Sequence, residues 1–247
     1  MSELTYSEIF ADPENTYRLA MERVPRARDA EFIAIRELLS LGEVSTLVDI
    51  PAGGGYLKQH LPKHIHYTGL EFSHGFSHGN NLVKHCTEAS IPLANESQGA
   101  VVSLAAAHHL ENRSAFYTEV ARILEPKGCF ILADVEQSSK IDWFLNTFVN
   151  QWNSQGHHGR FLDRKEESDT LRDCGFQTEF TRKDFFWRFE DRSQMLSFAR
   201  QLFRLDLNPS DSELLSALEK LGISEEQGQT RLLWSLCCFI AQKSSRN

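Results

Sequence analysis

An acid followed by three glycines is the first group of residues with the means to do chemistry. Residues 48–57 read VDIPAGGGYL, in which an apolar run ends at Asp49 and residues 53–55 are glycines. Glycine has no Cβ, so its backbone can turn with positive φ and approach a ligand closely. A second acid, Glu71, follows roughly 20 residues later, the offset at which nucleotide-binding folds place a carboxylate that accepts the hydroxyls of a ribose. The pattern predicts a ligand that carries a nucleoside.

Strand-like runs of apolar residues recur at regular intervals around these acids. The runs are residues 45–50, 66–72, 99–105 and 128–135. They are apolar throughout, as strands covered on both faces of a sheet must be. Helix-like stretches lie between them, and residues 114–124 are the clearest because their apolar side chains fall on one helical face. We therefore predict an α/β fold, a Rossmann-like doubly wound sheet whose ligand crevice lies at the carboxyl ends of the strands.

Helical segments flank this core on both sides. Pro25 marks a break between two helices of an N-terminal cap, and a helix that ends at Gly175 leads into a further strand. Residues 230–243 read as the last strand of a mostly parallel sheet, running antiparallel to the others. The predicted division is a single domain, residues 1–247, with a helical cap at 1–43, a core at 44–136, and helical lid insertions at 137–160 and 188–229.

In this order and spacing the motifs resemble those of the class I S-adenosylmethionine-dependent methyltransferases of the small-molecule type. The first motif of that family is an acid followed by glycines at alternating positions, which residues 49–55 match. Glu71 matches the ribose-binding acid, and residues 87–112 match the adenine loop and the fourth strand. Residues 121–135 match the helix, the Pro-Lys-Gly turn and the fifth strand. The matches cover most of residues 44–136.

The resemblance implies S-adenosylmethionine as the cofactor. Two positions depart from the usual pattern: Pro51 replaces the first glycine and removes an N–H, and Thr87 stands where many relatives have an acid for the adenine amino group. A nicotinamide enzyme would need a third glycine at the G-x-G-x-x-G offset, which GGGYLK lacks. The glycines could alternatively form only a tight turn. The implied cofactor-binding residues are Asp49, Pro51, Ala52, Gly53, Gly55, Glu71, Thr87, Glu88 and Leu104.

Histidines are the residues best suited to activate an acceptor. His108 and His109 follow the fourth predicted strand, where the resembling enzymes place residues between cofactor and acceptor. Methyl transfer from a sulfonium is an in-line displacement, so alignment and exclusion of water matter most, and an alcohol or phenol would also benefit from an imidazole base. We predict His108 and His109 as catalytic, with local packing or solvation as the alternative for each. No acidic pair stands at metal-ligand spacing, so we expect no metal site.

Aromatic residues of the first insertion could form the wall of an acceptor site. Trp143 and Trp152 recur at helical spacing, which fits either packing onto the core or an apolar acceptor pocket. Tyr17 matches the region where the resembling enzymes lay an aromatic ring across the cofactor, and His157 lies in the SQGHHGR loop. These four residues are the predicted acceptor contacts.

The predicted function is methyl transfer from S-adenosylmethionine to a small-molecule acceptor. One alternative is a carboxyl methyltransferase of a free or carrier-protein-bound acid, because the second insertion resembles the lid of the malonyl-carrier-protein carboxyl methyltransferases. An acyl carrier protein would then be a partner, and the lid arginines would either meet the anionic acceptor or lie on a solvated face. Another is a non-catalytic S-adenosylmethionine-binding relative, which the departures at Pro51 and Thr87 motivate. The lid arginines are Arg188, Arg192, Arg200 and Arg204.

The composition of the chain excludes several classes of protein. Its 247 residues are 41% hydrophobic, which suits one large globular domain, and a net charge of -8 argues against a nucleic-acid partner. The five cysteines form no C-x-x-C pair, and nowhere do 18 uncharged apolar residues run together. We expect a reduced, cytoplasmic protein without a membrane segment, as a monomer or a homodimer.

Overall fold

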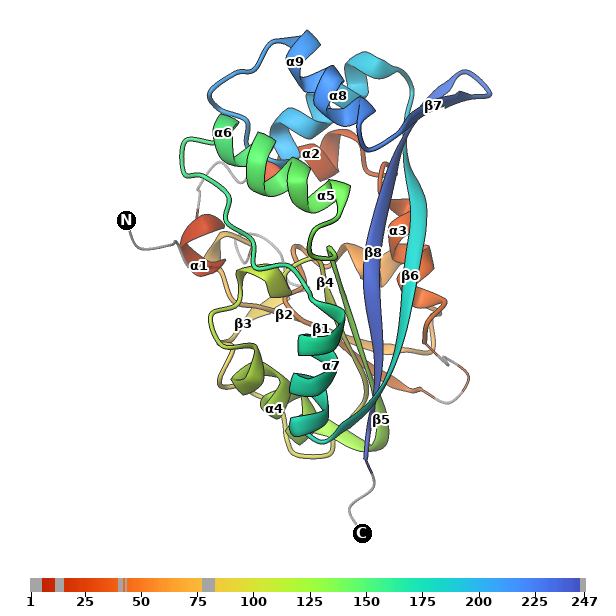
Figure 1. Ribbon diagram of the computed structural model, residues 1–247. Helices are drawn as coiled ribbons and strands as arrows, with labels where there is room; N and C mark the ends of the chain where they lie inside the picture. Colours follow the sequence, from red (N-terminus) through yellow and green to blue (C-terminus); the bar gives the residue numbers. More distant parts are fainter. Residues whose placement is uncertain (1–5, 12–15, 40–41, 43, 77–82, 245–247) are drawn as a thin grey trace.

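The fold is given by a computed structural model, which describes residues 6–11, 16–39, 42, 44–76 and 83–244 (Figure 1). Its α-helices are α1 (Tyr6–Ile9), α2 (Thr16–Arg23), α3 (Asp29–Arg36), α4 (Arg113–Ile123), α5 (Lys140–Trp143), α6 (Asn150–Trp152), α7 (Arg164–Asp173), α8 (Arg192–Leu202) and α9 (Asp211–Glu219). Other helical segments are η1 (Tyr56–His60), η2 (His74–Phe76), η3 (Ala107–His109) and the π-helix η4 (Phe144–Val149). The strands are β1 (Thr46–Asp49), β2 (His66–Glu71), β3 (Val83–His85), β4 (Gln98–Leu104), β5 (Leu124–Asp134), β6 (Phe176–Phe189), β7 (Ile223–Glu226) and β8 (Gln229–Lys243). Within these ranges, no helix combines the length and the apolar character that spanning a membrane requires.

The strands form one sheet in the order β3-β2-β1-β4-β5-β8-β6, and β7 pairs with β8 outside this path. Strands β1 to β5 pair in parallel, whereas β8 runs antiparallel to β5, β6 and β7. The carboxyl ends of β1, β2 and β4 therefore meet at one edge of the sheet. This topology confirms the predicted doubly wound, mostly parallel sheet with an antiparallel last strand.

The central strands are buried on both faces, which explains their unbroken apolar runs. On one face, Leu47 of β1 and Ala100 of β4 join Ile35 of α3 in a buried cluster. On the other face, Val48 of β1 packs in a cluster with Phe116 of α4. Side chains alternate along a strand, so the neighbours Leu47 and Val48 enter opposite clusters.

The connection beside the glycine loop is shorter than the alternating pattern predicts. β1 and β2 are joined by the five-residue 3₁₀ helix η1 and not by an α-helix. Pro62 follows it closely and disfavours helical backbone at the residue before it. Helix α3 packs against η1 and β6. The predicted N-terminal cap therefore covers the face that a crossover helix covers in a standard doubly wound fold.

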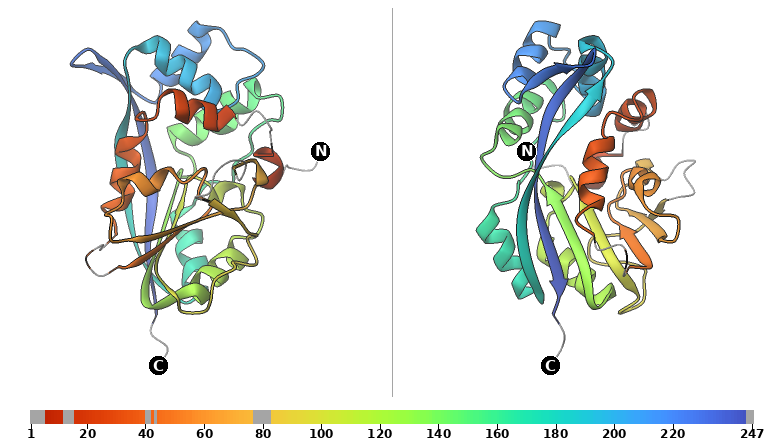
Figure 2. Two further views of the ribbon diagram at one scale, coloured as in Figure 1. Left: turned by 180° about the vertical axis from the view of Figure 1, so that it is seen from behind. Right: turned by 90° about the vertical axis from the view of Figure 1, so that its right-hand side faces the viewer.

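Two long strands carry the lid away from the sheet. β6 and β8 stay paired from Phe176↔Lys243 to Phe189↔Thr230. Figures 1 and 2 show this β6–β8 ribbon running from the far end of the sheet to the region of α8 and α9. Helices α5, η4 and α6 complete the same region of the molecule.

The second predicted insertion, residues 188–229, is only partly helical. Helices α8 and α9 lie inside it, and Ser210 caps α9 through a reciprocal capping box with Glu213. However, β6 continues to Phe189, and β7 pairs with β8 near the other end of the insertion. Trp187 and Phe189 are buried, and Arg188 between them is exposed. This alternation of buried and exposed side chains is typical of a strand.

Candidate active site

The glycine loop leaves β1 at the sheet edge where the parallel strands end. Its three glycines all have positive φ: 53° at Gly53, 101° at Gly54 and 80° at Gly55. A Cβ added to Gly53 would lie 3.6 Å from the Tyr17 hydroxyl, its nearest neighbour outside the loop. Such a Cβ would enter a cavity, which both Gly53 and Tyr17 line. The loop therefore presents bare backbone to the cavity.

Glu71, at the end of β2, holds this loop in place. Its Oε2 accepts a hydrogen bond of 2.8 Å from the Gly53 N–H, and its Oε1 accepts from the backbone of Phe72 and Ser73. Burial raises the pKa of Glu71 to about 7, against the lowering effect of these three hydrogen bonds. Tyr6 of α1 covers the carboxylate and also hydrogen-bonds to it.

Asp49 is the second buried acid of the loop. Its Oδ2 accepts a 2.8 Å hydrogen bond from the Tyr67 hydroxyl. Burial raises the pKa of Asp49 to about 8, with a contribution from nearby Glu71 and against the effect of the Tyr67 hydrogen bond. The two acids thus share one poorly solvated corner, and Asp49 faces the cavity.

A buried ion pair borders the cavity beside the glycine loop. Arg28 donates to Glu31 at 2.5 and 2.7 Å and to the Tyr17 hydroxyl at 2.7 Å. The Trp187 indole N–H donates to Glu31 at 2.8 Å, which ties the N-terminal cap to the β6–β8 ribbon. Arg28 and Glu31 are 5% and 0% exposed, so each charge is balanced by the other and not by water.

We expect Arg28→Met to lower the free energy of unfolding by about 3–5 kcal/mol, because it leaves the Glu31 carboxylate buried without its cation. Chemical denaturation measures the change. Arg26→Met is the matched control: Arg26 also pairs with an acid three residues on, Asp29, but its side chain is 89% exposed. That variant should lose less than about 1 kcal/mol. Equal losses in the two variants would contradict the buried network.

A cavity of about 900 Å³ connects the glycine loop with the lid. Ligand pockets typically hold roughly 300–1,000 Å³, so this one has room for two ligands side by side. Its lid wall is aromatic: Trp187 of β6 and Trp234 of β8 stack at 4.3 Å between ring centroids, and Phe203 stacks on Trp234. The lining residues on the sheet side include Asp49, Pro51, Ala52, Gly53 and Leu104.

His108 also lines the cavity, in η3 directly after β4. Its Nδ1 lies 2.8 and 3.0 Å from the two carboxylate oxygens of Asp134, at the end of β5. A carboxylate only accepts hydrogen bonds, so Nδ1 carries a proton, and in the neutral ring Nε2 then offers a lone pair. Burial would raise the pKa of Asp134, but the interactions with His108 outweigh it and hold that pKa below its usual value.

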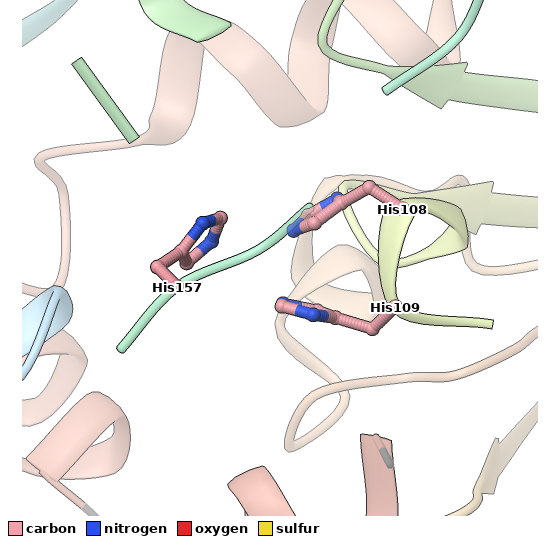
Figure 3. A group of neighbouring side chains, drawn as sticks. All are labelled: His108, His109 and His157. Atoms are coloured by element: carbon pink, nitrogen blue, oxygen red, sulfur yellow. The ribbon is translucent and has the colours of Figure 1, made fainter. Parts of the chain in front are cut away.

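His109 and His157 line the cavity beside His108 (Figure 3). The His157 backbone N–H donates to Asn150 at 2.8 Å, and its Nδ1 lies 3.2 Å from Asn146 Oδ1. Burial and the neighbouring imidazoles lower the pKa of His157 to about 3 and that of His109 well below its usual value. Both rings are therefore neutral at physiological pH and keep a lone pair.

Several predicted site residues lie outside the cavity lining of the described ranges. Gly55 turns the loop by donating to the Ala52 carbonyl. Thr87 pairs with Ser90 in a tight turn, and Glu88 accepts from the backbone of residues 111 and 112. These contacts hold the loop after β3 against the start of α4 and so take both side chains away from the cavity.

The two predicted tryptophans are also outside the lining. Trp143 packs under Lys220, whose Nζ lies 4.0 Å from the ring centroid, and Trp152 packs beside Phe148. The π-helix η4 lies between them and turns less per residue than an α-helix, so the helical phase counted from the sequence fails there. Leu145 and Val149 of η4 line the cavity in their place.

Sequence reasoning missed residues that only tertiary contacts bring to the site. The clearest examples are Asp134, Asn146 and Arg28. Asp134 and Asn146 contact histidines that lie far away in the sequence, and Arg28 is buried together with its partner Glu31. The Arg28–Glu31 spacing of three residues indicates an ion pair on a helix, but no pattern indicated its burial.

A family model and a curated relative match parts of this chain. Residues 48–132 match a methyltransferase domain family. A curated relative, the malonyl-[acyl-carrier protein] O-methyltransferase of Hahella chejuensis, is 25% identical over 159 residues, which are 59% of this chain. The match spans only 55% of that relative's length.

Solved structures share the fold over nearly the whole chain. A SAM-dependent methyltransferase from Thermotoga maritima superposes with a TM-score of 0.63 at 18% identity, covering 97% of this chain and all of the other. A geranyl diphosphate methyltransferase in complex with SAM gives a TM-score of 0.53 at 14% identity, covering 88% of this chain and 84% of the other. The domain match covers residues 48–132, and these solved methyltransferases share the fold of this chain.

Proposed function

We propose that this chain transfers a methyl group from S-adenosylmethionine to a small-molecule acceptor. One observation carries the proposal: a single cavity extends from the bare backbone of Gly53 to the imidazoles of His108, His109 and His157. The glycine loop suits the cofactor, and the imidazoles suit an acceptor that must be deprotonated or polarised. The aromatic lid wall between them favours an acceptor with an apolar body.

The residues at the glycine loop fit the cofactor. Glu71 would accept the ribose hydroxyls, which would take over the hydrogen bond that Tyr6 now makes. Gly53 leaves space that a Cβ would fill. Tyr17 and Arg28 border the same space, where Arg28 would attract the carboxylate of the methionine part. When bound, S-adenosylmethionine supplies a methyl group on a positively charged sulfur.

His108 is the residue best placed to act on an acceptor. Asp134 fixes its ring orientation and its tautomer, so in the neutral ring Nε2 is left to accept a hydrogen bond. An O–H, S–H or N–H acceptor donating to this nitrogen becomes a better nucleophile. The aromatic wall excludes water that would compete with it.

Calorimetric titration with S-adenosylmethionine and with S-adenosylhomocysteine tests the cofactor half of the proposal. We expect both to bind with micromolar dissociation constants. The acceptor half is tested by screening small hydroxyl, thiol and amine compounds for formation of S-adenosylhomocysteine. Binding without turnover across the panel would favour a non-catalytic relative, and binding of neither compound would overturn the proposal.

A second candidate, methylation of a carboxylate, is favoured by the malonyl-[acyl-carrier protein] O-methyltransferase relative. Of the lid arginines, Arg204 lines the cavity, where it donates to Gln155 and lies 3.8 Å from Asp206, while Arg192 and Arg200 pair with Glu225 and Asp211. Arg204 would exchange these contacts for an anionic acceptor.

If the acceptor is a carboxylate, we expect Arg204→Ala to raise its KM roughly 10- to 100-fold, because a hydrogen bond to a charged group contributes about 1.5–3 kcal/mol. Steady-state kinetics measures the KM of the carboxylate, and inhibition by its neutral methyl ester measures the Ki of a compound without the charge. Arg192→Ala, which removes an arginine of the same lid, should leave both constants unchanged. A similar rise in the Ki of the neutral ester in Arg204→Ala would count against the carboxyl assignment.

A further inference from the structure

Three imidazoles meet at the acceptor end of the cavity. The ring nitrogens that His108, His109 and His157 offer all lie within 4.8 Å of one another. Figure 3 shows the three rings turned toward one another from two separate segments of the chain. Histidine is the commonest protein ligand of transition metals. Three protein ligands with one position left open form the typical ligand set of a catalytic zinc site.

Two of the rings are anchored through their outer nitrogen, as metal-bound histidines are. His108 Nδ1 donates to the buried Asp134 carboxylate, so Nε2 is its ligand atom. His157 Nδ1 lies 3.2 Å from Asn146 Oδ1. The Arg160 N–H also donates to the His108 carbonyl, which joins the loop of His157 to η3.

The orientation of the Asn146 amide settles which nitrogen of His157 carries the proton. Asn146 Nδ2 donates to Asp142 Oδ1 and to the Gly159 carbonyl, both at 2.9 Å, while its Oδ1 accepts from the Gly159 N–H at 2.7 Å. Oδ1 is therefore the atom that faces His157, and His157 Nδ1 must donate to it. This leaves Nε2 of His157 as the ligand atom, as in His108.

We propose that His108, His109 and His157 bind one divalent transition-metal ion of the zinc class, with its open position facing the cavity. Metal–nitrogen bonds of about 2.0–2.1 Å in a tetrahedral site place the ligand atoms roughly 3.3 Å apart. The rings, now within 4.8 Å, would close around the ion by side-chain rotation and small shifts of the loop that carries His157.

The role of this ion in catalysis rests on the proposed function. A hydroxyl or thiol acceptor bound at the open position loses its proton to solvent more readily, because the metal lowers its pKa. Its lone pair then forms the bond to the methyl carbon, and the electron pair of the broken carbon–sulfur bond leaves with the sulfur as a neutral thioether. His108 would then act through the metal in place of accepting the proton itself.

The site is tested by titrating the metal-stripped full chain with Co²⁺, followed by displacement with Zn²⁺. We expect one ion per chain and the visible absorption bands of tetrahedral Co²⁺, both lost in His157→Ala and in His109→Ala. His158→Ala and His66→Ala are the matched controls. His158 is the next residue on the same loop, and His66 is exposed at the opposite end of the parallel strands. Both should bind Co²⁺ as the unmodified chain does.

Absence of tetrahedral Co²⁺ bands in the unmodified chain would overturn the inference, as would equal loss in His158→Ala. Calorimetry with S-adenosylmethionine on the same metal-stripped protein separates this outcome from failure of the proposed function. Cofactor binding without metal binding rejects only the metal site. Metal binding without cofactor binding supports the metal site and rejects the proposed methyl transfer.

Discussion

In Glu71→Ala we expect the affinity for S-adenosylmethionine to fall at least about 100-fold. The variant removes an acceptor of two ribose hydroxyls, and hydrogen bonds to a charged group contribute about 1.5–3 kcal/mol each. It also frees the Gly53 N–H, which Glu71 now holds at 2.8 Å, so the glycine loop loses its anchor. Calorimetric titration measures the change in the dissociation constant.

Two further variants separate binding from folding. Gly53→Val directs a side chain into the cavity and should also abolish binding, without touching the Glu71 carboxylate. Glu88→Ala removes an acid that matches the adenine loop but accepts hydrogen bonds from the backbone of residues 111 and 112, so the dissociation constant of this variant should stay within about threefold of that of the unmodified chain. Thermal unfolding must show that each variant is folded. Full affinity in folded Gly53→Val would disprove the placement of the cofactor.

His108→Ala should lower kcat for methyl transfer by roughly 10²–10⁴-fold, the range for loss of a positioned acid–base group. The dissociation constant for S-adenosylmethionine should change little, because Asp134 of β5 holds His108, whereas Glu71 of β2 holds the glycine loop. His108→Asn is the safer variant for folding, since its amide can still donate to Asp134. Rapid-quench kinetics with saturating cofactor measures the effect on the chemical step.

Asp134→Asn tests whether His108 works only when it is held in one tautomer. Both carboxylate oxygens of Asp134 accept hydrogen bonds. Oδ1 accepts from the backbone N–H of Val135, and Oδ2 accepts from the backbone N–H of His108. The ring Nδ1–H of His108 is within hydrogen-bond distance of both oxygens. An asparagine offers one oxygen, so its amide must face a donor and the ring must turn or shift its proton. We expect a loss of kcat similar to that of His108→Asn. An unchanged kcat would mean that the tautomer is irrelevant.

The sheet could be predicted because its signals are local. Unbroken apolar runs identified β1, β2, β4 and β5, and Gly175 marked the end of α7 through its positive φ of 92°. The strands β3 and β7 were missed because each is short and becomes regular only by pairing with a neighbour. The predicted start of the second insertion, residue 188, falls within the last two residues of β6, which stays paired with β8 as far as Phe189.

The candidate site divides in the same way. The glycine loop is contiguous in the chain, so its role could be inferred from order and spacing alone. His157 reaches His108 only because Asn146 and Asn150 hold its loop from a neighbouring helix. The sequence search for metal ligands considered acidic pairs, and such a search cannot find imidazoles assembled from two distant segments. Arg28 was missed because burial is a property of the packed molecule.

The paired course of β6 and β8 has a consequence for how this protein could acquire new acceptors. The segment between them, residues 190–228, begins after Phe189 and ends before Gln229. Phe189 pairs with Thr230, so the two ends of the segment lie side by side on the sheet. Changes in its length or composition leave the pairing of the core strands untouched, while Trp187 and Trp234 still supply one wall. Residues 190–228 could therefore be replaced while the strands that carry them stay paired. Chimeras joined at Phe189 and Gln229 should keep cofactor binding and change the acceptor.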